Sequence, residues 1–281
     1  MKKIAFEKYH ALGNDFLVID LISGRLPGIK IGSLAESICN RNTGVGADGI
    51  LILKKSRRCD CFLDIYNSDG SWAEKSGNGL RIAGAYLYAN YTRRKNISIE
   101  TKKDISEIKL IRFSGGNFNI RVSLGRPNFN SRDVPIKSRR PYHINSPVKI
   151  KGKEFVLTAV SVGNPHAVIF VHDFNFDWCH LGSVIETAKI FPNRTNVEFV
   201  RIINRSRIIL NDWERGAGAT GSSGTGAGAS VAAGVINGFL NREVEVVFPL
   251  GSLRVDWRED DDNLYLTGPA EFVCRGEYLL R

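Results

Sequence analysis

The chain has 281 residues, which is long for one hydrophobic core and suits two domains of roughly 130–140 residues. Hydrophobic residues make up 43% and charged residues 24%, and no run of about 20 apolar residues occurs, so the composition indicates a globular protein and excludes a membrane span. The net charge is +10, but the basic residues form short clusters that are not interleaved with aromatic residues. We therefore expect a solvated basic surface and no nucleic-acid partner.

The five cysteines are odd in number and irregularly spaced, which does not fit a disulfide framework. Cys59 and Cys61 are too close for a usual zinc pair, and no second pair completes a site, so no metal is expected. Polar residues from His10 onward interrupt the apolar run that a secretion signal would need. These features favour a reducing, cytoplasmic location.

The first half of the chain alternates short strands with turns. Apolar periodicity predicts a hairpin of two strands, a helix, two strands, a second helix and three more strands. These elements span, in order, Ile4–His10, Phe16–Asp20, Ile29–Asn40, Gly49–Leu53, Cys61–Tyr66, Leu80–Leu87, Ile97–Thr101, Ile105–Phe113 and Phe118–Leu124.

Residues 125–141 are rich in Pro, Asn, Ser and Arg and are interpreted as a linker. The second half then repeats the order of the first, with strands at Phe155–Val162, Ala167–Val171, Asn196–Ile203, Ile208–Trp213, Val244–Phe248, Leu253–Trp257 and Asn263–Thr267 and helices near Cys179–Thr187 and Ala227–Leu240. Two strand-rich halves, each with one central helix, do not follow the regular alternation of a Rossmann sheet.

Two segments of the form Ser-Gly-polar-Gly, Ser76–Gly79 and Ser223–Gly226, each precede a run of small and apolar residues. A helix that begins this way directs unpaired backbone N–H groups and the positive end of its dipole at whatever lies beyond. One such anion site in each half indicates a small carboxylate held between two helix starts, with one serine on either side.

Short polar motifs at the ends of strands add to these two segments. Each, taken alone, fits a turn or a surface ion pair, and a lone His166 would more often be structural. Together they supply amide donors, one imidazole and an Arg that can bind a carboxylate through two hydrogen bonds, which suits a zwitterionic amino acid. There is no P-loop, metal cluster or evident lysine site for pyridoxal phosphate, so no cofactor is expected.

The chain resembles the diaminopimelate epimerase family, cofactor-independent epimerases of lysine and peptidoglycan synthesis. The motifs that carry the resemblance occur in family order over nearly the whole chain: His10–Phe16, Gly44–Gly49, Asn67–Ser71, Gly77–Arg81, Gly163–His166, Phe191–Phe199, Trp213–Gly216 and Gly224–Ala227. The resemblance implies an α+β fold of two pseudo-symmetric domains, each a barrel-like, mostly antiparallel sheet around a central helix. It implies domains at residues 1–125, completed by about 268–281, and at 126–267, with an active site in the cleft between them and a possible homodimer.

The resemblance also implies residue roles. The substrate-binding positions are Asn14, Asn67, Gly77, Asn78, Asn164, Asn196, Arg215, Gly224 and Thr225. The family mechanism uses two cysteines, one of which removes the Cα proton while the other donates a proton to the opposite face. Both positions are serine here, Ser76 and Ser223, and the usual Gly-x-Gly-Glu-Thr is Gly216-Ala217-Gly218-Ala219-Thr220.

A serine hydroxyl is a far weaker acid than a thiol, and each pKa unit corresponds to about 1.4 kcal/mol, whereas a helix dipole contributes only about 1–2 kcal/mol. Each serine would therefore need a partner base, and the resemblance suggests His166 and Glu214, one beside each serine. Three alternatives follow: an epimerase, or a variant of one with its cysteines replaced; an enzyme of the same fold with different chemistry, such as one-base isomerisation, elimination or cyclisation of an amino-acid-like substrate; and a non-catalytic amino-acid-binding protein.

Overall fold

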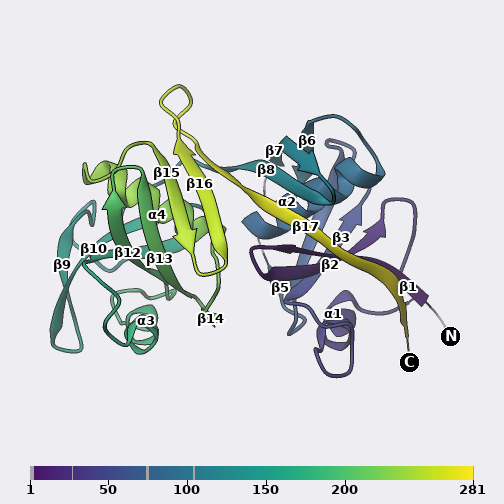
Figure 1. Cartoon of the computed structure of the whole chain (residues 1–281). Helices are drawn as coiled ribbons and strands as arrows, with labels where there is room; N and C mark the ends of the chain where they lie inside the picture. Colours follow the sequence, from purple (N-terminus) through teal and green to yellow (C-terminus); the bar gives the residue numbers. More distant parts are fainter. Residues whose placement is uncertain (1–2, 27, 74–75, 104, 281) are drawn as a thin grey trace. The chain divides into compact units, whose positions relative to one another are not determined.

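The computed structural model describes residues 3–26, 28–73, 76–103 and 105–280 (Figure 1). Met1 and Lys2, at the start of the segment considered as a secretion signal, and Arg281, at the end of the C-terminal segment, lie outside these ranges. The chain divides into two compact units, unit 1 with residues 1–122 and 267–281 and unit 2 with residues 123–266. Among the described residues, no helix is both long and apolar enough to cross a membrane.

Unit 1 is a barrel-like sheet around one helix. Its elements are β1 (Lys3–Ala11), β2 (Asn14–Leu21), α1 (Ile31–Cys39), β3 (Gly49–Lys54), β4 (Cys61–Asn67), β5 (Trp72–Ala73), α2 (Gly77–Asn90), β6 (Asn96–Glu100), β7 (Ile105–Ser114), β8 (Asn117–Gly125) and the C-terminal part of β17 (Leu264–Leu279). Neighbouring strands pair in the order β1, β2, β3, β4, β6, β7 and β8, and β17 pairs with both β8 and β1, which closes the ring. In Figure 1, β17 (yellow) runs beside β1 (purple).

Helix α2 is the core of unit 1. Buried residues run almost without interruption from Gly77 to Leu87, so the helix lacks the polar face of a surface helix. Glycines allow the sheet to approach it closely: a Cβ atom at Gly84 would lie 2.9 Å from Cγ2 of Ile108. The position of α2 inside the sheet follows from this nearly uniform burial.

Unit 2 repeats the order and the pairing of unit 1. Its elements are β9 (Ser146–Ile150), β10 (Lys153–Ser161), β11 (Pro165–Val171), α3 (Trp178–Glu186), β12 (Asn196–Asn204), β13 (Arg207–Glu214), β14 (Gly218–Ala219), α4 (Gly224–Ile236), β15 (Glu243–Phe248) and β16 (Gly251–Trp257). The pairs β11–β12 and β13–β15 are parallel, as are β2–β3 and β4–β6 of unit 1, and the intervening pairs are antiparallel in both units. The expected α+β fold of two similar halves, each a mostly antiparallel sheet around a central helix, is confirmed.

Some boundaries differ from those expected. Both central helices begin earlier than the apolar runs suggested, at Gly77 and Gly224, because the small residues after each serine already adopt helical geometry. Helix α4 ends at Ile236 instead of Leu240, because Gly238 has a left-handed φ of 73°, which stops the helix. The short strands β5, β9 and β14 were not predicted.

Residues 125–141, interpreted as a linker, are packed into unit 2. Val134 and Ile136 are buried in a hydrophobic cluster with Val148, Leu157 and Phe199. Asn128 forms an isolated bridge with Ser161. The segment is poor in apolar residues, and the few that it has are the ones that anchor it.

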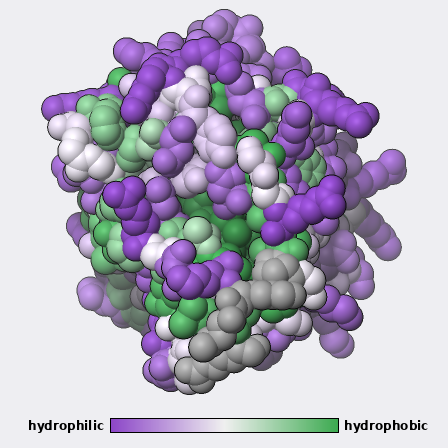
Figure 2. All heavy atoms as spheres, turned by 90° about the vertical axis from the view of Figure 1, so that its right-hand side faces the viewer, coloured by the Kyte–Doolittle hydropathy of each residue, from purple (hydrophilic) through white to green (hydrophobic). Residues whose placement is uncertain are grey.

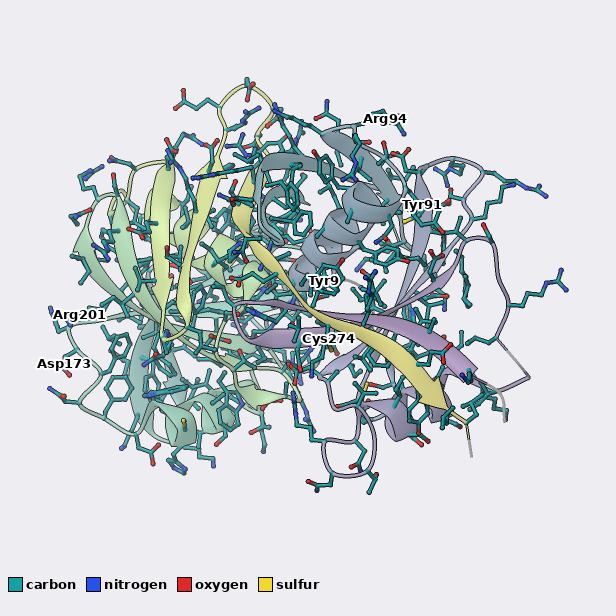
Figure 3. The ribbon with its side chains drawn as sticks, turned by 45° about the vertical axis from the view of Figure 1, so that its right-hand side comes forward. Tyr9, Tyr91, Arg94, Asp173, Arg201 and Cys274 are labelled. Carbon is teal, nitrogen blue, oxygen red and sulfur yellow. The ribbon has the colours of Figure 1, made fainter. Side chains whose placement is uncertain are left out.

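Charged side chains cover much of the surface. Figure 2 shows a face on which hydrophilic side chains lie at the top and around the rim, while hydrophobic ones gather in its middle and lower part. In Figure 3, Arg94 and Arg201 lie at the outer surface of their own units, and Arg94 is ion-paired with Asp60. These positions fit the solvated basic surface expected from the net charge.

Candidate functional site

Each unit presents the start of its central helix in the same way. Ser76 caps α2, and its Oγ accepts a hydrogen bond of 3.0 Å from the backbone N–H of Gly79. Ser223 caps α4 and accepts one of 3.1 Å from Gly226 N–H. The earlier N–H groups of each first turn have no carbonyl partner within the helix, so each start can bind an anion.

In unit 1, a chain of hydrogen bonds with a fixed direction leads away from the start of α2. Arg81 Nη2 donates to Asn78 Oδ1 (2.6 Å), Asn78 Nδ2 donates to Asn14 Oδ1 (2.9 Å), and Asn14 Nδ2 donates to Asp48 Oδ2 (2.8 Å). Arginine can only donate and an ionised aspartate can only accept, so the two charged ends fix the orientation of both amides. Each amide keeps a second N–H for another acceptor.

Arg81 is fully buried, with 0% of its surface exposed. Its remaining donors meet the carbonyl oxygens of Gly77 (3.4 Å) and Pro269 (3.2 Å), and burial lowers its pKa to about 9. A cation held beneath the start of α2 adds to the positive end of the helix dipole. This part of unit 1 therefore favours an anion.

Charged residues also fix Asp48, the last acceptor in this series of hydrogen bonds. Arg41 Nη2 lies 2.7 Å from Asp48 Oδ1 and 2.8 Å from Asp15 Oδ1, and Lys8 lies 2.8 Å from Asp15 Oδ2. Burial raises the pKa of Asp15, but hydrogen bonds from Arg41 and Lys8 outweigh this effect and the pKa is lowered. Asn67, the remaining predicted binding residue of unit 1, is exposed at the end of β4 and donates to Ser71 Oγ (3.0 Å).

In unit 2, Asn164 lies next to the start of α4 much as Asn14 lies next to the start of α2. Asn164 Nδ2 donates to Thr225 Oγ1 (3.4 Å), and its Oδ1 lies 2.9 Å from His166 Nε2. Nδ1 of His166 lies 2.6 Å from Glu198 Oε1, and the imidazole is 0% exposed. Because Asn164 Oδ1 accepts, Nε2 carries a hydrogen, and both ring nitrogens already have protein partners.

Glu198 is a buried carboxyl close to the start of α4. A Cβ atom at Gly226 would lie 3.2 Å from Glu198 Oε1 and 3.0 Å from Ser223 Oγ, which places both oxygens around the first turn of the helix. Burial raises the pKa of Glu198, and the neighbouring His166 opposes this rise. Sequence reasoning assigned Glu198 no role; the available signal was an acid in the middle of an apolar strand.

His166 and Glu214 were expected one beside each serine. Both lie in unit 2, where Glu214 Oε1 accepts a hydrogen bond of 2.9 Å from Thr220 Oγ1. Burial raises the pKa of Glu214, although the Thr220 hydrogen bond and His166 favour its ionised form. A partnership of either residue with Ser76 stays a prediction.

Asn196 and Arg215 form the remaining part of the predicted site. Asn196 is 5% exposed; its Nδ2 donates to Pro165 O (2.8 Å), and its Oδ1 accepts from the backbone N–H of Arg215 (2.9 Å). The exposed Arg215 side chain donates through Nη1 to Asn193 O (3.2 Å). Its other guanidinium donors can therefore meet a carboxylate.

None of the five cysteines belongs to α2, to α4 or to the serine motif before either helix. They are free, and they lie on or beside α1, β4, α3 and β17. Burial raises the pKa of Cys39 and of Cys61 to about 12. Neither thiol would ionise readily near neutral pH.

Solved structures with a similar fold include epimerases and racemases. A predicted epimerase from Pseudomonas aeruginosa matches with a TM-score of 0.69 and 15% identity over 99% of this chain and 100% of that chain. A hydroxyproline epimerase from Agrobacterium vitis matches with a TM-score of 0.69 and 12% identity over 99% of this chain and 91% of that chain. At these identities the likeness shows the fold that the chain shares with these proteins, two similar units with one central helix each.

Sequence comparison specifies the family. A sequence model described as Diaminopimelate epimerase matches residues 6–130 and 158–273. The diaminopimelate epimerase of Carboxydothermus hydrogenoformans is 42% identical over 98% of this chain and 99% of its own length, and that of Halothermothrix orenii is 39% identical over 99% of both. The chain belongs to the diaminopimelate epimerase family.

Proposed function

We propose that this protein epimerises diaminopimelate at Cα, interconverting the LL and meso forms for lysine and peptidoglycan synthesis without a cofactor. The observation that carries the proposal is that both units have the same kind of helix start. Each central helix has a serine cap, and the second residue of each helix meets an asparagine near the start of a strand, Asn78 with Asn14 and Thr225 with Asn164. Two such anion-binding ends suit the doubly charged carboxylate that develops when a Cα proton leaves.

We assign carboxylate binding to the N–H groups of Gly77 and Asn78 at the start of α2 and of Gly224 and Thr225 at the start of α4, as the sequence resemblance implies. We assign the other amino and carboxyl groups of the substrate to Asn67, Asn196 and Arg215, together with Asn14 and Asn164. Arg215 supports this assignment, because its exposed guanidinium keeps donors available for a second carboxylate.

Ser76 and Ser223 occupy the positions where the sequence resemblance implies the two cysteines. A hydroxyl cannot form a thiolate-like base at neutral pH, so we assign the proton transfers to other groups. His166 and Glu214 are the candidates, and Glu198, in contact with His166, supports the imidazole. The serines would then orient the reacting groups and cap the helices.

A second function, isomerisation or elimination with one base, is favoured by a difference between the units. His166 and Glu198 lie on paired strands β11 and β12, whose registers match those of β2 and β3. The equivalent positions in unit 1 are Phe16 and Leu51. A single set of acid and base groups in one unit suits chemistry at one face of Cα.

Proton NMR in deuterium oxide with LL- and meso-diaminopimelate separates these functions. Loss of the Cα–H signal together with interconversion of the two isomers supports the epimerase. Deuterium exchange without a change of configuration supports one-base chemistry. An unchanged spectrum with a ligand-induced rise in melting temperature indicates a binding protein and overturns the proposed reaction.

Restoring the thiols is a second test of the same site. We expect Ser76→Cys with Ser223→Cys to raise the rate of Cα exchange, because a thiol near pKa 8.5 ionises far more readily than a hydroxyl. Each single replacement is the matched control. A folded double variant that neither gains exchange nor binds diaminopimelate would contradict the assigned substrate.

We further propose that the enzyme is cytoplasmic, in keeping with its free cysteines, and that it forms a homodimer. Light scattering coupled to size-exclusion chromatography would test the dimer, since a mass near the 31.2 kDa of one chain would contradict it.

A further inference from the structure

Thr220 connects two carboxyl groups in unit 2. Its Oγ1 lies 2.9 Å from Glu214 Oε1 and also within hydrogen-bond distance of Asp212 Oδ2. A threonine hydroxyl has one proton and can donate to only one of these oxygens. The second contact is a hydrogen bond only if the other carboxyl is protonated and donates to Thr220 Oγ1.

The surroundings of Asp212 also favour a proton on its carboxyl group. Asp212 is 1% exposed, and its Oδ1 has no hydrogen-bond partner among the described residues. Asp212 pairs directly across β12 and β13 with Glu198, which is 0% exposed. Like charges on directly opposed strand positions are destabilising, and burial strengthens the repulsion.

The groups that face Asp212 can be named for each neighbouring element. They are Glu214 on its own strand, Thr220 after β14, Glu198 on β12, and beyond Glu198 the imidazole of His166 on β11. Helix α4 carries no titratable side chain. Among these groups, all of them in the described part of the chain, His166 is the one that can become a cation, against three carboxyls, and its ion-pair partner is Glu198.

Unit 1 shows that the fold does not need these polar groups. Leu51 pairs with Ile65 across β3 and β4, and this pair corresponds to Glu198 and Asp212 across β12 and β13. The serine cap of the central helix follows Ile65 and Asp212 after the same number of residues. By the same register, Ala73, opposite Ile65, corresponds to Thr220. A Cβ atom at Gly79 would lie 3.1 Å from Cδ2 of Leu51, just as one at Gly226 would lie 3.2 Å from Oε1 of Glu198.

We infer that Asp212, Thr220 and Glu214 form a carboxyl–hydroxyl–carboxyl relay that holds one shared proton, which makes Asp212 a positioning residue for Glu214. When the Asp212 carboxyl gives its proton to Thr220 Oγ1, the hydroxyl gives its own proton to Glu214, so Asp212 becomes the carboxylate and Glu214 the acid. The reverse transfer restores the first state, and no other reactant is needed. The use of this proton at Cα rests on the proposed function, whereas the relay itself does not.

Infrared spectroscopy tests the relay without any turnover. The unsubstituted protein in deuterium oxide at pH 7 should show a carboxylic-acid C=O band that Asp212→Asn removes. Glu214→Gln should lower the pH at which this band disappears, because it removes a neighbouring negative charge. Thr220→Val should shift the band frequency by breaking the hydrogen bond, and Thr220→Ser should restore it.

Two infrared results would contradict the relay. If the protein and Asp212→Asn have the same C=O absorption at pH 7, or if Thr220→Val leaves the band unchanged, the relay does not exist. Asp260→Asn, which changes an exposed carboxylate of the same unit, is the matched control and should not alter the band.

Cα exchange with diaminopimelate tests the use of the relay. Asp212→Asn should lower kcat by about a hundredfold or more, as expected for a lost contribution to acid–base catalysis, with KM changed less than about twofold. Thr220→Ser should keep most of the rate and Thr220→Val should lose it. If the unsubstituted protein shows no exchange, the proposed function fails, while the infrared spectra still decide the relay. Exchange that Asp212→Asn leaves unchanged, in both rate and pH profile, would overturn the positioning role.

Discussion

The Asp212 side chain links the stability of the protein to pH. Its pKa is raised from 3.8 to about 8, first by burial and then by the charge of Glu214. Between these two values the folded protein holds a proton that the unfolded chain has released, so the free energy of unfolding falls as the pH rises through this window. Each unit of the raised pKa corresponds to about 1.4 kcal/mol.

Asp212→Asn should therefore flatten this dependence. The amide cannot ionise, so the variant should be more stable than the unsubstituted protein at pH 9 and should lose that advantage at pH 5. Urea unfolding at several pH values measures the difference, with Asp260→Asn as the exposed control. The same stability difference between Asp212→Asn and the unsubstituted protein at pH 5 and at pH 9 would show that Asp212 is already ionised at pH 5 in the folded protein.

Arg81 offers a second test at the scale of one residue. Arg81→Met keeps a long side chain in a fully buried place but removes the donor that orients Asn78. We expect diaminopimelate to bind at least tenfold more weakly, because the amide can turn and the cation beneath α2 is lost. Calorimetric titration measures the affinity, with the exposed Arg94→Met as control. Unchanged affinity in a folded variant would show that Arg81 does not contribute to binding of diaminopimelate.

The two capping serines act at the scale of the helix. Ser76→Ala and Ser223→Ala each remove the acceptor for an N–H in the first turn, and each should cost about 1 kcal/mol of unfolding free energy. Asp177→Ala, which removes the cap of α3, is a control away from the site. Both serine variants should also lose Cα exchange. Equal stability of the serine variants and the unsubstituted protein would contradict a capping role.

The elements themselves were largely predictable. The strands and helices of both halves follow from apolar periodicity, because burial on one side of a strand imposes a two-residue period. The starts of α2 and α4 were misplaced, since glycine-rich first turns carry no periodic signal. Strands β5 and β14 were missed because two residues are too few to show any pattern.

The sheet of unit 1 is built from strands that are far apart in the sequence, with β1 paired to β17. β17 pairs with β1 from Lys3↔Leu279 to His10↔Glu271 and also with β8. It also supplies the carbonyl of Pro269 to Arg81. The ring of strands around α2 is closed by β17.

A chain that ends at Leu266 should therefore fail to fold unit 1. The edges of β1 and β8 would lose their hydrogen-bond partners and α2 would lose its cover. Hydrogen exchange measured by mass spectrometry should show α2 and β1 unprotected, whereas a chain that ends at Leu279 should keep their protection. Protected α2 amides in the shorter chain would contradict the closing role of β17.

The amino-acid sequence was enough to predict the repeat, the fold class, the family and an anion site before each central helix, because each depends on the order and spacing of residues that are close in the chain. The contacts within unit 2 came from the folded structure alone: His166 lies against Glu198, Glu198 pairs with Asp212, and Thr220 connects Asp212 with Glu214. The register of the strands also showed that the apolar residues Phe16, Leu51 and Ile65 are the matching positions of unit 1. The physical reason is that pairing register brings together residues far apart in sequence, and burial, which no short motif encodes, then sets their protonation.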